Sequence, residues 1–139
     1  MRTNLTALMV LLVIGSAVLG VTRPAFADLG DIAVGGVWTF RLTRGIGAMS
    51  LAERVADVER RITNVLSNPR YRERGVTLTV RPVGPSAAIL VEEAVILTVT
   101  PEDVADTGVK VTTMELARQW AQRLAGGINK GFPATVVAF

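Results

Sequence analysis

The chain has 139 residues, of which half are hydrophobic, and it contains neither cysteine nor histidine. A chain of this length forms one domain or at most two very small ones. Without cysteine there is no disulfide, zinc–thiolate site or thiol nucleophile. Without histidine the usual general base near neutral pH and the commonest metal ligand are missing. The composition therefore favours a binding protein over an enzyme, and we expect neither a metal nor a cofactor.

The first 27 residues have the features of a secretory signal peptide. Arg2 gives a positive N-terminal region, and residues 7–21 form an uncharged apolar run. Residues 25–27 (Ala-Phe-Ala) place small side chains at the positions that a signal peptidase reads. We therefore predict cleavage before Asp28 and a periplasmic or extracellular location. The alternative is a retained membrane anchor, although a span normally needs about 17 to 25 apolar residues.

Cleavage leaves residues 28–139 as the mature chain, and this part is close to neutral. The whole chain has 15 basic and 12 acidic residues, and removing Arg2 and Arg23 leaves 13 basic residues against 12 acidic ones. A nearly neutral domain has little electrostatic attraction for nucleic acid. We expect a single mature domain that binds no nucleic acid and does not span a membrane.

A first strand is predicted over residues 32–42, where β-branched and aromatic residues alternate loosely with polar ones. Gly35-Gly36 would form a bulge or delay the start of this strand. Trp38 lies in this segment on an apolar face, and Trp120 lies on the apolar face of a later helix. We expect both tryptophans to anchor the core rather than to serve as ligand platforms.

A helix is predicted from Leu51 to about Leu66. Ser50 and Glu53 have the spacing of a capping box, in which each side chain accepts a hydrogen bond from the other residue's backbone amide. Apolar residues then recur at spacings of three and four along one face, and Arg54 lies outside that face. Asn68-Pro69 ends the helix, because proline disfavours helical backbone in the residue before it.

Three strands are predicted after this helix. Residues 76–80 alternate strictly between apolar and polar, which is typical of a strand with one buried face. Two shorter strands follow over residues 87–91 and 94–100, joined at Glu92-Glu93. Glutamate adopts the left-handed backbone of a tight turn less easily than glycine or asparagine does. One long strand is therefore the alternative.

The last third of the chain carries two helix starts. Thr100-Pro101 begins a short helix that ends at Gly108, and residues 112–115 form a second capping box. We expect this last helix to end at about Ala125 and to be capped by Gly126-Gly127. The tail from about residue 127 is predicted to be either a frayed end or a short docking strand.

These elements predict an α+β fold in the order β-α-β-β-β-α, without an internal repeat. The sheet is mixed or antiparallel with about four strands, and two main helices pack on one of its faces. This fold follows the signal peptide as a single domain over residues 28–139.

Carboxylates are the main candidates for catalysis in this composition. Glu92 and Glu93 are adjacent, and neighbouring strand residues point to opposite faces, so they do not form an acid–base pair there. Glu102 and Asp103 suit a helix start on electrostatic grounds alone. The sequence has no calcium-loop, phosphate-loop or serine-nucleophile motif. We predict no catalytic site; a hydrolase using carboxylates alone would need two acids about 5 to 9.5 Å apart.

One local concentration of positive charge follows the first helix. Three arginines surround one tyrosine there, in the residues Arg70, Tyr71, Arg72 and Arg74. The planar fork of arginine donors suits phosphate and carboxylate groups. These four residues are the candidate binding site for an anionic ligand or a lipid head group. The alternative is a solvated connection in which the arginines pair with Glu73.

Three short segments lie at predicted helix and strand boundaries: residues 51–54 (LAER), 97–104 (LTVTPEDV) and 116–124 (LARQWAQRL). In this order they resemble the extracytoplasmic N-terminal region of cyanobacterial-type small-conductance mechanosensitive-channel-like proteins. The resemblance spans roughly residues 34–124. It implies a region that follows a signal peptide and precedes the membrane helices of a pore, and it implies no catalytic residue. We expect no membrane helix after Gly126, so channel activity is not implied.

These observations lead to two hypotheses of function. The first is a secreted or periplasmic, non-enzymatic accessory or interaction domain with a protein partner in the cell envelope, such as a detached sensor module of a mechanosensitive-channel-like system. The alternative is a module that binds an anionic ligand or lipid head group through Arg70, Tyr71, Arg72 and Arg74.

Overall fold

The computed structural model describes residues 29–138, so the predicted signal peptide lies outside the described residues. Ten elements follow one another as β1 (Asp31–Val34), β2 (Val37–Arg41), α1 (Leu51–Leu66), α2 (Pro69–Arg74), β3 (Val76–Val83), β4 (Ser86–Val91), β5 (Ala94–Val99), α3 (Pro101–Thr107), α4 (Thr113–Ile128) and β6 (Ala134–Ala138). β1 and β2 pair with each other, and the other strands form a four-stranded sheet in the order β5-β4-β3-β6. The fold is α+β, as predicted. Within the described range, no helix combines the length and the apolar character needed to cross a bilayer.

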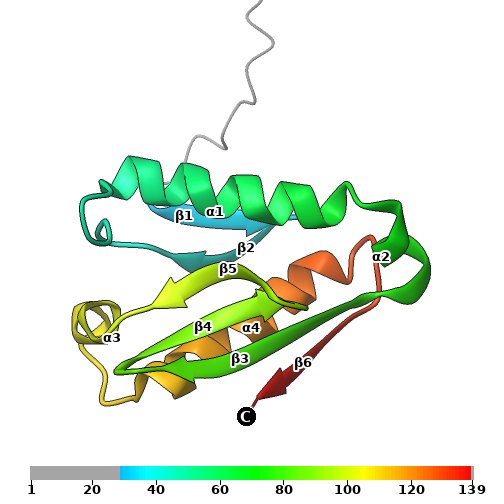
Figure 1. Ribbon diagram of the computed structural model, residues 1–139. Helices are drawn as coiled ribbons and strands as arrows, with labels where there is room; N and C mark the ends of the chain where they lie inside the picture. Colours follow the sequence, from blue (N-terminus) through cyan, green and yellow to red (C-terminus); the bar gives the residue numbers. More distant parts are fainter. Residues whose placement is uncertain (1–28, 139) are drawn as a thin grey trace, which may run out of the picture.

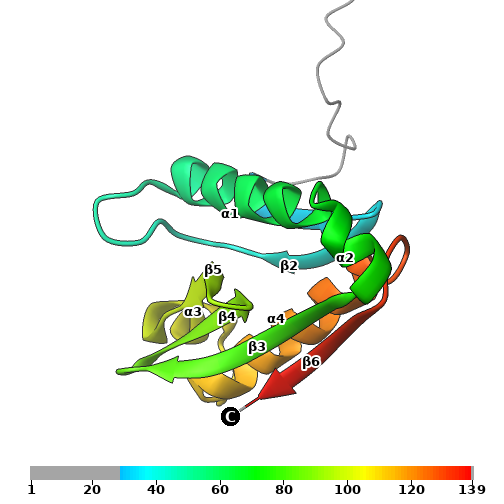
Figure 2. The same ribbon diagram turned by 45° about the vertical axis from the view of Figure 1, so that its right-hand side comes forward.

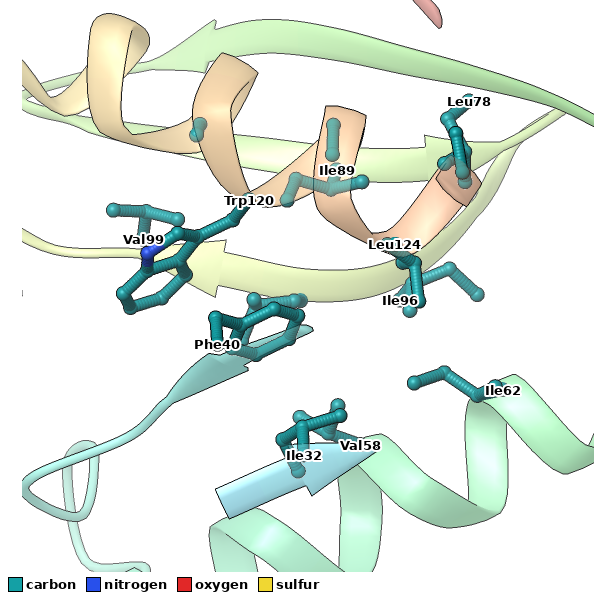
Figure 3. Packing of buried hydrophobic residues seen from close by; sticks show 14 of the residues in the cluster. Ile32, Phe40, Val58, Ile62, Leu78, Ile89, Ile96, Val99, Trp120 and Leu124 are labelled. Carbon is teal, nitrogen blue, oxygen red and sulfur yellow. The ribbon is translucent and has the colours of Figure 1, made fainter. Parts of the chain in front are cut away.

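The hydrophobic core lies between the four-stranded sheet, α4, α1 and the β1–β2 hairpin (Figures 1 and 2). α4 runs across one face of the sheet, and α1 meets the same core from beyond the β5 edge, beside the hairpin. Figure 3 shows Ile62 of α1, Ile96 of β5 and Leu124 of α4 directed toward one another. The sheet is mixed, because β6 pairs with β3 in parallel and the other pairs are antiparallel.

The segment predicted as a single first strand is a hairpin of two strands. Gly35 and Gly36 have φ values of 60° and 76°, and Val34 pairs with Val37 across them. Two positive φ values in a two-residue loop are typical of a type I′ turn, whose twist matches that of the paired strands. The expected bulge at the glycines was therefore wrong, because two consecutive glycines supply the backbone that reverses the chain.

Trp38 was wrongly expected in the core, whereas the expectation for Trp120 is confirmed. Trp38 is 50% exposed and Trp120 is 5% exposed. The pairing of β1 with β2 skips Thr39, since Phe40 pairs with Ile32 while Trp38 pairs with Ala33. An extra residue of this kind turns the next side chain to the other face. Phe40 therefore stacks on Trp120 at 4.8 Å between ring centroids (Figure 3), and Trp38 faces outward.

The predicted helix starts are confirmed, with complete capping boxes at Ser50 and Thr112. The expected end of α4 was wrong, because the helix continues through Gly126 and Gly127 to Ile128. A Cβ atom on Gly127 would lie 2.8 Å from the carbonyl oxygen of Val34. This glycine therefore allows the hairpin to approach α4 closely and does not end the helix.

The structure decides between the alternatives that the sequence left open for three further segments. The connection after Asn68 is the short helix α2, whose first turn is stabilised by an Asn68 side chain that accepts from the amide of Arg70. β4 and β5 are separate strands, and Glu92 adopts the left-handed backbone between them, with φ 55°. The C-terminal segment forms β6 rather than a frayed end.

The outer edge of β5 is closed by arginine side chains from α1. Arg54 donates to the carbonyl oxygen of Thr98 at 2.8 Å, and Arg61 donates to that of Val95 at 2.7 Å. Unpaired carbonyl and amide groups along an edge strand attract further strands. Covering these two carbonyls reduces that tendency on one side of the sheet.

Candidate binding groove beside helix α2

A groove of about 350 Å³ lies where the segment with three arginines meets the sheet. Its lining residues are Arg70, Tyr71, Arg74, Gly75, Thr77, Thr79 and Glu92. α2 leads directly into β3, and the alternation of β3 directs Thr77 and Thr79 away from the core. The turn between β4 and β5 adds Glu92. The groove is therefore built by three segments, namely α2, the first half of β3 and the β4–β5 turn.

Arg70 and Glu92 form an ion pair across this groove. The Nη2 atom of Arg70 lies 2.6 Å from Oε1 of Glu92, and both side chains are about half exposed, at 51% and 50%. A pair with this exposure contributes about 0 to 1 kcal/mol, because water screens it and both side chains lose freedom. An incoming anion can therefore replace Glu92 on Arg70 at small cost.

The side chain of Arg74 has no hydrogen-bond or ion-pair partner among residues 29–138. The next residue, Gly75, has φ 79°, and a Cβ atom there would lie 2.7 Å from the carbonyl oxygen of Pro133. Only glycine fits this position without a shift of the backbone. The constraint fixes the end of α2 against the segment before β6, and Arg74 is left with its charge directed to the groove and solvent.

Arg72 is the predicted site residue that does not line the groove. Its guanidinium lies 5.9 Å from the ring centroid of Phe132, an arrangement typical of a cation–π contact. The structure thus brings Arg70, Tyr71 and Arg74 together and separates Arg72 from them. The reason is that the segment is helical, so alternate residues do not share one side.

The sequence did not indicate Thr77, Thr79 or Glu92 as groove residues. The polar positions of the alternating segment 76–80 gave a signal for the two threonines, because they had to face away from the core. Glu92 reaches Arg70 only through the fold, 22 residues along the chain.

Three of the four acidic residues considered for catalysis have separate partners. Glu92 binds Arg70, and Glu93 lies 3.4 Å from Arg81. Asp103 is 3% exposed and has structural partners, whereas Glu102 is exposed at the start of α3. Among residues 29–138, no group of three or more acidic side chains is arranged to hold a metal ion.

Comparison with known proteins places the chain in a family. The model of a protein family described as a domain of unknown function (DUF8459) matches residues 31–131, from β1 through α4. The matched segment includes α2, β3 and the β4–β5 turn, and hence every residue of the groove. No curated protein and no solved structure matches the chain. Because the family model covers well over half of the sequence, the chain belongs to the DUF8459 family.

Proposed function

We propose that the chain is a non-enzymatic binding domain of the cell envelope and that its groove takes an anionic group. The observation that carries this proposal is the position of Arg74, a cation with no partner among the described residues, in a groove that also holds Arg70 and two threonines. An arginine in this setting binds a carboxylate or phosphate through two parallel hydrogen bonds. Of the two hypotheses from the sequence, the groove favours anion binding.

Four of the lining residues have a part in this binding. Arg74 supplies the free charge, and Arg70 supplies a second fork once its contact with Glu92 is exchanged for the ligand. The hydroxyl group of Thr79 donates to a remaining ligand oxygen, and Tyr71 packs against the core and supports the groove wall. The site offers donors and charge, and its one carboxylate, Glu92, is held in the ion pair with Arg70. These groove residues support binding of a ligand without catalysis.

The experiment is a titration of the purified protein with three probes. These are inorganic phosphate, a short aspartate-rich peptide, and vesicles of phosphatidylglycerol with phosphatidylcholine vesicles as their control. We expect saturable binding of at least one anionic probe that weakens as salt is raised. The probe that binds most tightly identifies the source of the anionic group. Failure of all three to bind at low salt contradicts the proposal.

The envelope location depends on the leader and has its own test. We propose that residues 1–27 are removed and that the domain is released into the periplasm or the medium. The expected result is an intact mass, measured on protein from the native cell, that corresponds to a chain starting at Asp28. Full-length protein in the cytoplasm would contradict this part of the proposal.

A second candidate function is attachment to a protein partner, as in an accessory module of a mechanosensitive-channel-like system. The half-exposed Trp38 favours it, because exposed tryptophan is enriched among residues that dominate protein interfaces. Its ring is held by Asp31, which accepts from Nε1 at 3.1 Å, and by Arg123, whose guanidinium is 5.5 Å from the ring. This candidate predicts that Trp38→Ala abolishes cross-linking to an envelope channel protein while Arg74→Gln leaves it intact. Equal cross-linking by both variants would contradict it.

A further inference from the structure

The outer edge of β6 carries backbone groups that point away from the sheet. In a parallel pair, alternate residues of a strand direct both their amide and carbonyl groups to the neighbour. The amide of Val76 donates to the carbonyl oxygen of Pro133 at 2.7 Å, and Val76 is in register with Ala134. Thr135 and Val137 therefore bond to β3. It follows that Ala134, Val136 and Ala138 direct their amide and carbonyl groups outward.

The first of these outward residues is already satisfied. The side-chain oxygen of Asn129 accepts from the amide of Ala134 at 2.6 Å, and its side-chain nitrogen donates to the carbonyl oxygen of Ala134 at 3.2 Å. The asparagine amide thus occupies the place that a neighbouring strand would take. Val136 and Ala138 have no such partner within residues 29–138. The β6 edge is open at these two residues, in contrast to the β5 edge, which Arg54 and Arg61 cover.

We propose that this open edge pairs with the same edge of a second copy of the chain. An antiparallel pair placed on a two-fold axis at Val137 puts Val136 of one copy opposite Ala138 of the other. Residues opposite each other in this way exchange both of their hydrogen bonds. All outward amide and carbonyl groups of Val136 and Ala138 are then hydrogen-bonded to the other copy. Ala134 keeps its two hydrogen bonds to the side chain of Asn129. The open edge of one copy is therefore complementary to the same edge of the other copy, which is the condition for a two-fold contact.

The side chains along the edge agree with this arrangement. Val137 is 40% exposed on the outer face of the sheet. On the two-fold axis it lies opposite Val137 of the second copy in a non-hydrogen-bonded pair, in which the Cα atoms are closer than in a hydrogen-bonded pair. β6 (Ala134–Ala138) has no charged residue and no proline, the residues that natural edge strands use against pairing. Figures 1 and 2 show β6 at the border of the sheet, with no helix along its outer side. The two copies form one continuous eight-stranded sheet.

The first test measures the mass of the purified protein by sedimentation equilibrium over a range of concentrations. The wild type is expected to form a concentration-dependent dimer, since the strand contact is short. Val137→Lys places two like charges on the axis and is expected to give a monomer. Val83→Lys is the matched control. Val83 is an exposed valine of β3 on the same face of the sheet as Val137, beyond the part of β3 that pairs with β6. It is expected to leave the dimer unchanged.

The second test uses the absence of cysteine from the chain. Opposed residues of a non-hydrogen-bonded pair lie about 4.5 Å apart at Cα, within the range that a disulfide spans. Val137→Cys is therefore expected to form a covalent dimer on mild oxidation, and Val83→Cys is expected to form no covalent dimer while it keeps the non-covalent one. Thermal melting of each variant confirms that it is folded. A wild type that stays monomeric up to millimolar concentration, or equal cross-linking of the two cysteine variants, overturns the proposal. A dimer that survives Val137→Lys overturns it as well.

Discussion

Arg54 of α1 and Asp103 of α3 form a two-pronged ion pair inside the protein. The two guanidinium nitrogens lie 2.8 and 2.7 Å from the two carboxylate oxygens, and the side chains are 3% and 1% exposed. Arg54 also donates to the carbonyl oxygens of Arg44 and Thr98. The carboxylate of Asp103 accepts from the amide of Thr100 at 2.9 Å. This pair joins α1 to the sheet and to α3, and among residues 29–138 no buried side-chain nitrogen or oxygen atom lacks a hydrogen-bond partner.

Arg54→Met is expected to lower the free energy of unfolding by about 3 to 5 kcal/mol, because it leaves the Asp103 carboxylate buried without its cation. Urea denaturation measures the change. Arg60→Met on the same helix is the control, since Arg60 is exposed and its pair with Asp57 lies at the surface. That change is expected to cost at most about 1 kcal/mol. Equal losses in the two variants would contradict the structural role of Arg54.

Gly126 and Gly127 are adjacent in α4 and are expected to respond oppositely to alanine. A Cβ atom on Gly127 would meet the carbonyl oxygen of Val34 at 2.8 Å and its Cβ atom at 3.0 Å, whereas one on Gly126 meets nothing within 4 Å. Gly127→Ala is expected to destabilise the protein by about 1 to 3 kcal/mol through overpacking. Gly126→Ala is expected to stabilise it by about 0.5 to 1 kcal/mol through helix propensity. Thermal unfolding of both variants measures these changes, and effects of the same sign would contradict this prediction.

Glu92 holds Arg70 from a left-handed backbone position, with φ 55°. Glu92→Gly relieves that backbone and frees the Arg70 guanidinium, so we expect the affinity for inorganic phosphate to rise several-fold. Glu93→Gly is the control, because Glu93 pairs with Arg81, which does not line the groove. Its affinity is expected to match the wild type. Weaker phosphate binding by Glu92→Gly would show that Glu92 serves the ligand rather than competes with it.

Asp106 makes stability depend on pH in the acidic range. Hydrogen bonds from Arg44, at 2.7 Å, and from Thr43, at 2.6 Å, lower the pKa of this carboxyl from 3.8 to about 2. A carboxyl whose pKa is lower in the folded state stabilises the fold above its unfolded pKa. This stabilisation is therefore present above pH 4 and is lost as the pH falls from 4 toward 2.

Asp106→Asn and Arg44→Gln are both expected to reduce the slope of stability against pH in that window. Urea midpoints measured between pH 4 and pH 2 show the effect. The slope falls because Asp106→Asn removes the carboxyl, whereas Arg44→Gln removes the largest cause of its lowered pKa and leaves only the hydrogen bond from Thr43. An unchanged slope in Asp106→Asn would contradict the conclusion that Asp106 contributes to the pH dependence of stability.

The features predicted well from the sequence are those set by near neighbours. The capping boxes at Ser50 and Thr112 depend on residues three positions apart, and the alternation of residues 76–80 fixes which face of β3 is buried. The features missed depend on distant partners. Arg54 is buried because of Asp103, 49 residues away, and Gly127 is required by the approach of Val34.

The candidate site shows the same division. The segment from Arg70 to Arg74 is recognisable from its composition, but its helical form decides which arginines share a side. Arg74 lines the groove, and Arg72 lies against Phe132. Glu92 enters through the β4–β5 turn, which no local pattern connects with α2. Trp38 faces outward because the strand pairing skips Thr39, and that irregularity leaves no mark in the sequence.

Phosphate titration of two variants from the same helix tests the central claim most directly. Arg74→Gln and Arg72→Gln remove the same charge, but only Arg74 lines the groove. Arg74→Gln is expected to weaken phosphate binding by about tenfold or more, the loss typical of a charged hydrogen bond, while Arg72→Gln stays close to the wild type. Equal weakening in both variants would mean that net charge alone attracts the anion. That result, or unchanged binding by Arg74→Gln, would contradict a built anion site in the groove.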